Sequence, residues 1–178
     1  MVTWGDAKFG GDSHSVADEL KSGVTAVFNA GDGLAAACAA LKECGKVVTW
    51  GDAECGGDSQ SVADELKSGV TAVFNTYHAF AALKEGGRVV TWGGAECGGD
   101  SQSVAGELKN GVTMVFSTGR AFAALKDCWS DGHLSKLNLK QLKKKVHRLS
   151  QDVHFKRIGQ ETDKAALIAT IREFHLLA

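Results

Sequence analysis

Apolar and polar segments recur in the same order three times along the first 128 residues. Each copy has a short β-branched and aromatic stretch, such as RVVTW at 88–92, and a Gly- and Asp-rich stretch, such as GDAECGGDS at 51–59. Two further apolar stretches follow, as in VTAVFNT at 70–76 and AFAALK at 79–84. We therefore predict about three strands in each copy, joined by loops and turns.

Between the loop and the second apolar stretch, SVADELKSG at 61–69 has the composition of a short helix. Ser61 stands where an N-cap would lie, and Asp64 follows three residues later, as in a capping box. Gly69 is suited to end the helix. We therefore expect one helical turn in each copy.

The period of the pattern follows from the tryptophans at positions 4, 50 and 92, which are 46 and then 42 residues apart. Segments 48–85 and 90–127 differ at eight positions, so they agree at 30 of 38. Such a period is typical of repeat arrays, in which each unit buries its apolar face against the next. The predicted repeat core therefore contains Trp4, Trp50, Trp92, Phe28, Phe74 and Phe116.

The wording of the units resembles the RCC1-type repeat, which forms the blades of β-propellers. The shared features are Trp50-Gly51 and Trp92-Gly93, the Gly pair that follows, and the small-residue stretch at 79–87 before a Gly turn. The resemblance covers residues 1–128. It implies a mainly β array of three short units, arranged as an open or partial propeller or as a stack. The units are also similar to repeats in proteins of microalgae.

The two ends of the array differ from its middle. The chain starts within the VVTW-type stretch, and the third AFAALK stretch at 121–126 is followed by a different sequence. We therefore expect unpaired strand edges at 2–4 and 121–126. Exposed edges template pairing with other chains, so this chain is expected to be stable mainly within a larger complex.

The repeats carry few groups suited to catalysis. An active site needs different side chains that converge on one point, whereas near-identical units present the same groups at intervals. Asp52, Asp58 and Asp64 recur in a spacing that matches no calcium loop, so turn and cap roles are favoured over calcium. We predict no enzyme, no cofactor and no metal. The cysteines are expected to be buried free thiols in a reducing compartment: Cys38, Cys44, Cys55, Cys97 and Cys128.

From residue 129 the composition changes. Residues 129–178 have 10 Lys and Arg against 5 Asp and Glu, a net charge of +5, whereas residues 1–128 have 10 against 16, a net charge of −6. Apolar residues at helical spacing predict two capped helices, so 129–178 is expected to be a small all-α unit. Segment 137–171 resembles a SAP-type DNA-binding motif. That resemblance implies binding through a basic face: Lys140, Lys143, Lys144, Lys145, Arg148, Lys156, Arg157 and Lys164.

Two functions remain open on these observations. The first is a non-catalytic scaffold that docks as an accessory subunit onto a larger protein assembly, for example an organellar or photosynthetic complex. The alternative is binding of DNA or chromatin through the basic tail. The acidic body favours the first, because it repels nucleic acid. No apolar run reaches the length of a membrane span and no signal peptide is visible. We expect an intracellular, reducing compartment, with an organelle and the nucleus both open and peripheral membrane contact still possible.

Overall fold

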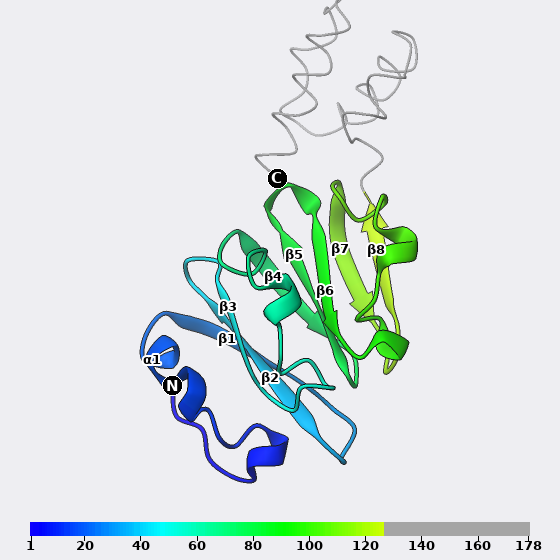
Figure 1. Cartoon of the computed structure of the whole chain (residues 1–178). Coiled ribbons are helices and arrows are strands. Elements are labelled where there is room, and N and C mark those ends of the chain that lie inside the picture. The colour runs from blue at the N-terminus through cyan, green and yellow to red at the C-terminus, as the bar shows by residue number, and fades with distance from the viewer. Residues whose placement is uncertain (127–178) are drawn as a thin grey trace, which may run out of the picture. The chain divides into compact units, whose positions relative to one another are not determined.

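In the computed structural model the chain divides into two units, Met1–Lys126 and Asp127–Ala178, and the structure describes residues 1–126. The helices, the SAP-like motif and the eight basic side chains predicted beyond residue 128 lie outside the described residues. The described unit is mostly β (Figure 1). It contains three small antiparallel sheets of three, three and two strands.

Each sheet consists of strands that follow one another in chain order, and the last strand of the first two sheets comes from the start of the next sequence repeat. The predicted stretches at 70–76, 79–84 and 88–92 correspond to the three strands of the second sheet, with shifts of one residue at their ends. The first sheet is β1 (Val24–Gly31), β2 (Ala36–Lys42) and β3 (Val47–Gly51); the second is β4 (Val70–Asn75), β5 (Ala79–Lys84) and β6 (Val89–Gly93); the third is β7 (Val112–Ser117) and β8 (Phe122–Lys126).

The strand register is the same in every repeat. Phe80 pairs with Trp92 across β5 and β6, as Cys38 pairs with Trp50 across β2 and β3. The first hairpin of each sheet has an irregularity at one place, after Val24, Val70 and Val112. Identical local sequences therefore give identical pairing, because register depends on which face of the strand is apolar.

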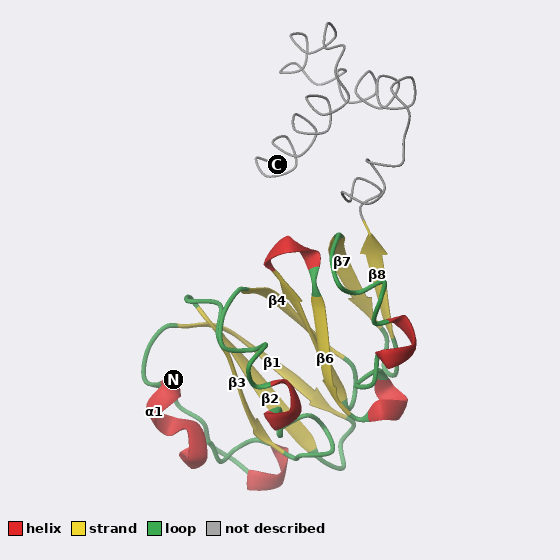
Figure 2. Cartoon of the chain, turned by 45° about the horizontal axis from the view of Figure 1, so that its top comes forward, coloured by secondary structure: helices red, strands yellow, loops and turns green. Residues whose placement is uncertain are grey.

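The helix predicted over 61–69 is wrong in detail. Gln60–Val62 forms a single 3-10 turn, and turns continue to Leu66. Ser61 lies inside that turn, and the Asp58 carboxylate accepts the Gln60 amide at 2.9 Å instead. Nine residues are too few to offset the cost of helix nucleation. Only the first repeat forms an α-helical turn within 1–126, α1 (Ala17–Leu20); the other 3-10 turns are Ala7–Phe9, His14–Val16, Glu85–Gly87, Ala95–Cys97 and Gln102–Val104 (Figure 2).

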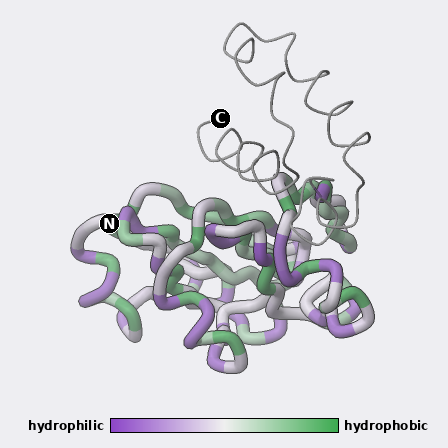
Figure 3. Tube along the Cα trace, turned by 90° about the horizontal axis from the view of Figure 1, so that it is seen from above, coloured by the Kyte–Doolittle hydropathy of each residue, from purple (hydrophilic) through white to green (hydrophobic). Residues whose placement is uncertain are grey.

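The sheets pack one against the next in sequence order. Strand β4 contacts β1 and β2, and β7 contacts β4 and β5. Apolar and hydrophilic stretches alternate along the chain path (Figure 3). Most of the core therefore lies between repeats, where small side chains on β2 and β5, such as Ala39 and Ala81, are fully buried. This packing makes each repeat depend on its neighbours for burial.

Candidate interaction surfaces of the repeat array

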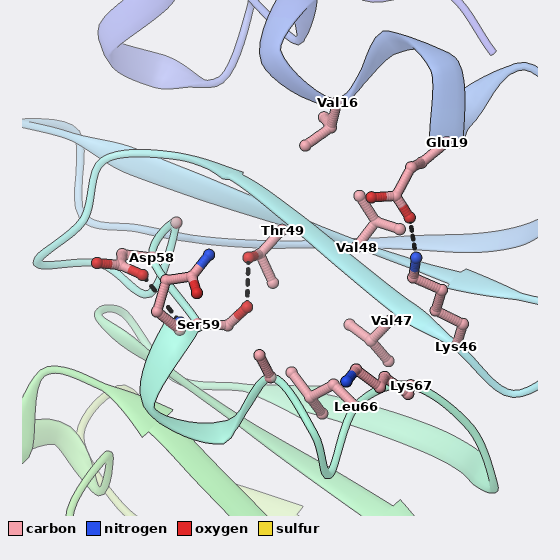
Figure 4. Close-up of a pocket in the computed structure, with 13 residues that line it drawn as sticks. Val16, Glu19, Lys46, Val47, Val48, Thr49, Asp58, Ser59, Leu66 and Lys67 are labelled. Carbon is pink, nitrogen blue, oxygen red and sulfur yellow. Dashed lines mark hydrogen bonds and ion pairs between the residues drawn. The ribbon is translucent and has the colours of Figure 1, made fainter.

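A groove recurs between consecutive repeats (Figure 4). The first, of about 250 Å³, runs from Val16 and Glu19 of one repeat to Lys46 and Ser59 of the next. The second, of about 350 Å³, is lined by the equivalent residues one repeat later. The two grooves therefore present one set of groups at a fixed interval, which suits an extended ligand better than a reacting centre.

The polar groups of these grooves bond to each other. Glu19 pairs with Lys46 in the first groove, and Glu65 pairs with Arg88 at 2.7 Å in the second. The hydroxyls of Thr49 and Ser59 lie 2.8 Å apart. The ionisable side chains that line the two grooves are carboxylates, lysines and one arginine.

The aspartates of the Gly-rich loops accept backbone amides. Asp52 accepts the amides of Glu54 and Cys55 at 2.9 and 3.2 Å, and Asp58 accepts that of Gln60. Asp64 instead pairs with Lys67 at 2.6 Å, which lowers the pKa of its carboxyl. Within residues 1–126 no three His, Cys, Asp or Glu side chains form a group suited to a metal ion.

Two polar contacts join the first and second, and the second and third, repeats. His78 Nε2 lies 2.9 Å from Asp32 Oδ2. The Leu34 amide and His78 together lower the pKa of Asp32. The hydroxyl of Thr76 is buried and donates to the Cys97 carbonyl at 3.0 Å. Each of these contacts ties one repeat to the next by a polar interaction.

The cysteines do not all follow the prediction of buried thiols. Cys55 and Cys97 are buried and Cys38 is half-buried, but Cys44 is exposed in the turn between β2 and β3. Burial, with a smaller contribution from the Asp52 carboxylate, raises the pKa of Cys55 to about 11. Its thiol is therefore protonated at neutral pH and is not a nucleophile.

The predicted repeat core is correct inside the array and wrong at its ends. Trp50 and Trp92 are 4% and 2% exposed, whereas Trp4 is 83% exposed. Phe116 is 54% exposed, while the equivalent Phe28 and Phe74 are half-buried. The local sequence of these positions is almost unchanged, but no further sheet covers them within the described part of the chain.

Each buried tryptophan bridges two repeats through contacts that the sequence alone did not reveal. Nε1 of Trp92 donates to the carbonyl of Gly56 at 3.0 Å, and Nε1 of Trp50 donates to that of Gly10 at 2.9 Å. The Trp92 ring stacks on Phe80 rather than on another tryptophan, with centroids 5.3 Å apart. The repeated Gly pair was the sequence signal for these hydrogen bonds. The carbonyl of its first member, Gly10 or Gly56, accepts the tryptophan Nε1–H of the next repeat.

At the C-terminal end of the array, β8 has the sequence of the buried strand β5, but most of its side chains are exposed. Phe80, Ala81 and Ala82 of β5 are fully buried. On β8 the equivalent Phe122 is half-buried, and Ala123 and Ala124 are exposed. Leu125 is 55% exposed. Both ends of the array therefore present apolar surface that a neighbouring repeat covers elsewhere, which is typical of interaction sites.

No known protein family and no curated protein matches this sequence. None of the helices in the described part of the chain has the length and apolar character needed to cross a membrane.

Proposed function

We propose that this chain is a non-catalytic interaction protein that docks onto a larger assembly through the ends of its repeat array. The observation that carries the proposal is the contrast between equivalent residues. Trp50 and Trp92 are buried by the preceding repeat, and Trp4 is exposed in the same local sequence. A large exposed aromatic ring is the kind of residue that dominates protein interfaces.

We also propose that the repeats are RCC1-like and that they serve as the scaffold of this interaction protein. Repeat arrays are suited to scaffolding because they present regularly spaced surfaces and tolerate exchange of single units. The grooves between repeats support this role, because their hydroxyls and charged side chains already bond to each other within the chain. An accessory subunit of an organellar or photosynthetic complex is one assembly of this kind.

The test is the mass of the particle that contains the chain in its native cell extract, measured by native electrophoresis or sedimentation with a tagged chain. We expect a mass well above that of the chain, and a loss of that mass in Trp4→Arg. The control is Leu34→Arg, because Leu34 is 73% exposed and lies in the turn between β1 and β2, outside the N-terminal segment and β8. Migration of the wild-type chain as a monomer would contradict the proposal.

A second function, binding of nucleic acid, is supported by the net charge of +5 over residues 129–178. Lysines and arginines that neutralise phosphates release counterions, so affinity for duplex DNA should fall steeply with added salt. Titration of the full chain into duplex DNA at about 50 mM and about 200 mM salt tests this. Replacement of Lys143, Lys144 and Lys145 by Gln should weaken the binding and reduce its salt dependence. No binding at the lower salt concentration would exclude the second function.

A further inference from the structure

Within residues 1–126, the third sheet has one strand fewer than the other two. The first two sheets end with the VVTWG strands β3 and β6, whereas the third consists of β7 and β8 alone. The chain continues beyond Lys126 as Asp-Cys-Trp-Ser, which is not the wording of such a strand. The four residues VTWG, which β3 and β6 share, occur once more in the chain, at Val2–Gly5, where they pair with no strand.

The N-terminal segment already has the position of β3 and β6 relative to its own repeat. The nitrogen of Met1 donates to the Leu20 carbonyl at 3.0 Å. One and two repeats later, Val47 donates to Leu66 and Val89 to Leu108, both at 2.9 Å. The hydroxyls of Thr3 and Ser13 are 2.7 Å apart, and the two equivalent pairs are 2.8 Å apart. The segment therefore lacks only the sheet to which β3 and β6 are hydrogen-bonded.

Gly5 gives independent support. Its φ is +111°, close to +100° at Gly51 and +98° at Gly93. At Gly93 a Cβ would lie 2.6 Å from the carbonyl oxygen of His78 at the start of β5, so the glycine permits close approach of the neighbouring strand. At Gly5 nothing lies within 4 Å. The same backbone is formed there, and the neighbouring strand is missing.

The third repeat has the matching cavity. A space of about 430 Å³ opens beside β8, lined mainly by apolar residues. In the second repeat the equivalent residues Leu66, Phe80 and Ala82 pack around Trp92 in one cluster. The space in the third repeat is thus the tryptophan site without its tryptophan. Its lining includes Val89, Gly98, Leu108, Val115, Phe122 and Ala124.

From this complementarity we infer that the Met1–Gly5 segment of one copy of the chain adds to β8 of a second copy as the third strand of its third sheet. The register of β5 and β6 places Trp4 opposite Phe122, with Thr3 opposite Ala123 and Val2 opposite Ala124. The Trp4 ring fills the cavity and stacks on Phe122, and its Nε1 donates to the carbonyl of Gly98. The inference rests on the proposed function and names its partner.

A second copy of the chain fits both surfaces, the Met1–Gly5 segment and the edge of β8 with its cavity. The N-terminal segment and β8 lie at opposite ends of the three-sheet array (Figure 1), so one copy does not join its own ends. The contact uses different surfaces on the two partners, and each copy has one of each. Such heterologous contacts close into a ring or extend as a filament. Added strands gain main-chain hydrogen bonds, and the pocket for the aromatic side chain supplies specificity.

The test uses two full-length variants that each lose one surface. Trp4→Arg removes the donor side chain, and Ala124→Arg fills the acceptor cavity. Both positions are exposed in the single chain, so neither change should unfold it. Sedimentation should show dimers or larger species for the wild type, and dissociation constants raised about 100-fold for either variant alone. Mixed one to one, the variants should form a dimer and nothing larger, because one donor and one acceptor remain. Leu34→Arg should behave as the wild type.

Engineered disulfides test the register. In a chain with Cys44 and Cys128 replaced by Ser, Thr3→Cys with Ala123→Cys should form a bond between copies, since directly opposed residues of antiparallel strands bring their Cα atoms within bonding range. The slipped pair, Thr3→Cys with Ala124→Cys, should not, because a shift of one residue moves the side chain to the other face.

Three outcomes would overturn the inference. One is a wild-type chain that remains monomeric at about 100 µM, a concentration that would reveal even micromolar affinity. Another is self-association that Trp4→Arg leaves unchanged. The third is a monomer whose β8 amides resist hydrogen exchange at every concentration, which would assign the cover of β8 to residues 127–178. If the purified chain is monomeric but its particle in extract is large and sensitive to Trp4→Arg, the proposed function stands and the second copy is excluded.

Discussion

The second and third repeats differ at eight of 38 aligned positions, yet one is a closed sheet and the other an open one. In the second, β6 covers β5, and Trp92 fills the space beside Phe80. In the third, the described chain ends at β8 and the same space is a cavity. Each sheet is therefore offset from the sequence repeat, because the strand that begins one repeat completes the sheet of the repeat before it.

Truncation of a tryptophan should give the largest difference in stability between a covered and an uncovered position. Trp50→Ala removes a buried ring and its hydrogen bond to Gly10, so we expect a loss of about 3–5 kcal/mol in the free energy of unfolding. Trp4→Ala, in the same local sequence, should change it by less than about 0.5 kcal/mol in the monomer. Urea denaturation at a low protein concentration measures both. Equal losses would mean that Trp4 is covered within a single chain.

The threonines at the turns before β5 and β8 give a smaller contrast. Thr76 is buried, donates to the Cys97 carbonyl and accepts the Ala79 amide at 3.1 Å. Thr76→Val leaves these buried groups without a partner and should cost about 1–2 kcal/mol. Thr118 occupies the same position in the third repeat, where it is exposed and water can replace it.

We therefore expect Thr118→Val to change stability by less than about 0.5 kcal/mol in the same denaturation experiment. A Thr118→Val loss as large as that of Thr76→Val would show that another part of the molecule buries this turn.

The smallest expected effect is a pH dependence at Cys55. Its pKa in the folded state is about 11, above the ordinary value of 9.0, so the unfolded chain loses this proton first as the pH rises. The free energy of unfolding should then fall with pH, by less than about 1 kcal/mol between pH 8 and 9.5. Cys55→Ala should remove this part of the slope. Parallel slopes for the wild type and Cys55→Ala would contradict the assignment.

Local sequence was sufficient for β1 to β8 but not for 2–5, where the VTWG stretch that forms β3 and β6 elsewhere forms no strand. Stretches such as VTAVFN and AFAALK form strands in every copy, because β-branched, aromatic and small residues fit a pleated, buried surface. It failed for 61–69, where good helix formers occupy too short a span between a loop and a strand. Helix propensity is a weak signal that tertiary contacts, such as the burial of Leu66, can override.

The candidate site was predicted only in part. The open edges at 2–4 and 121–126 follow from the order of segments along the chain. Within the described residues, 2–4 pairs with no strand and β8 pairs with β7 alone. The cavity beside Phe122 and the glycine carbonyls that receive the tryptophans could not be predicted, because they are formed by residues about 40 positions apart.

The amino-acid sequence alone indicates the number of repeats, the stretches that form β1 to β8 and the acidic character of residues 1–128. Only the tertiary structure decided which copies of a repeated residue are buried. Trp4, Trp50 and Trp92 have almost the same neighbours in sequence, so no local rule separates them. The physical reason is that burial depends on what lies across the interface, and in a repeat array that surface belongs to the adjacent unit.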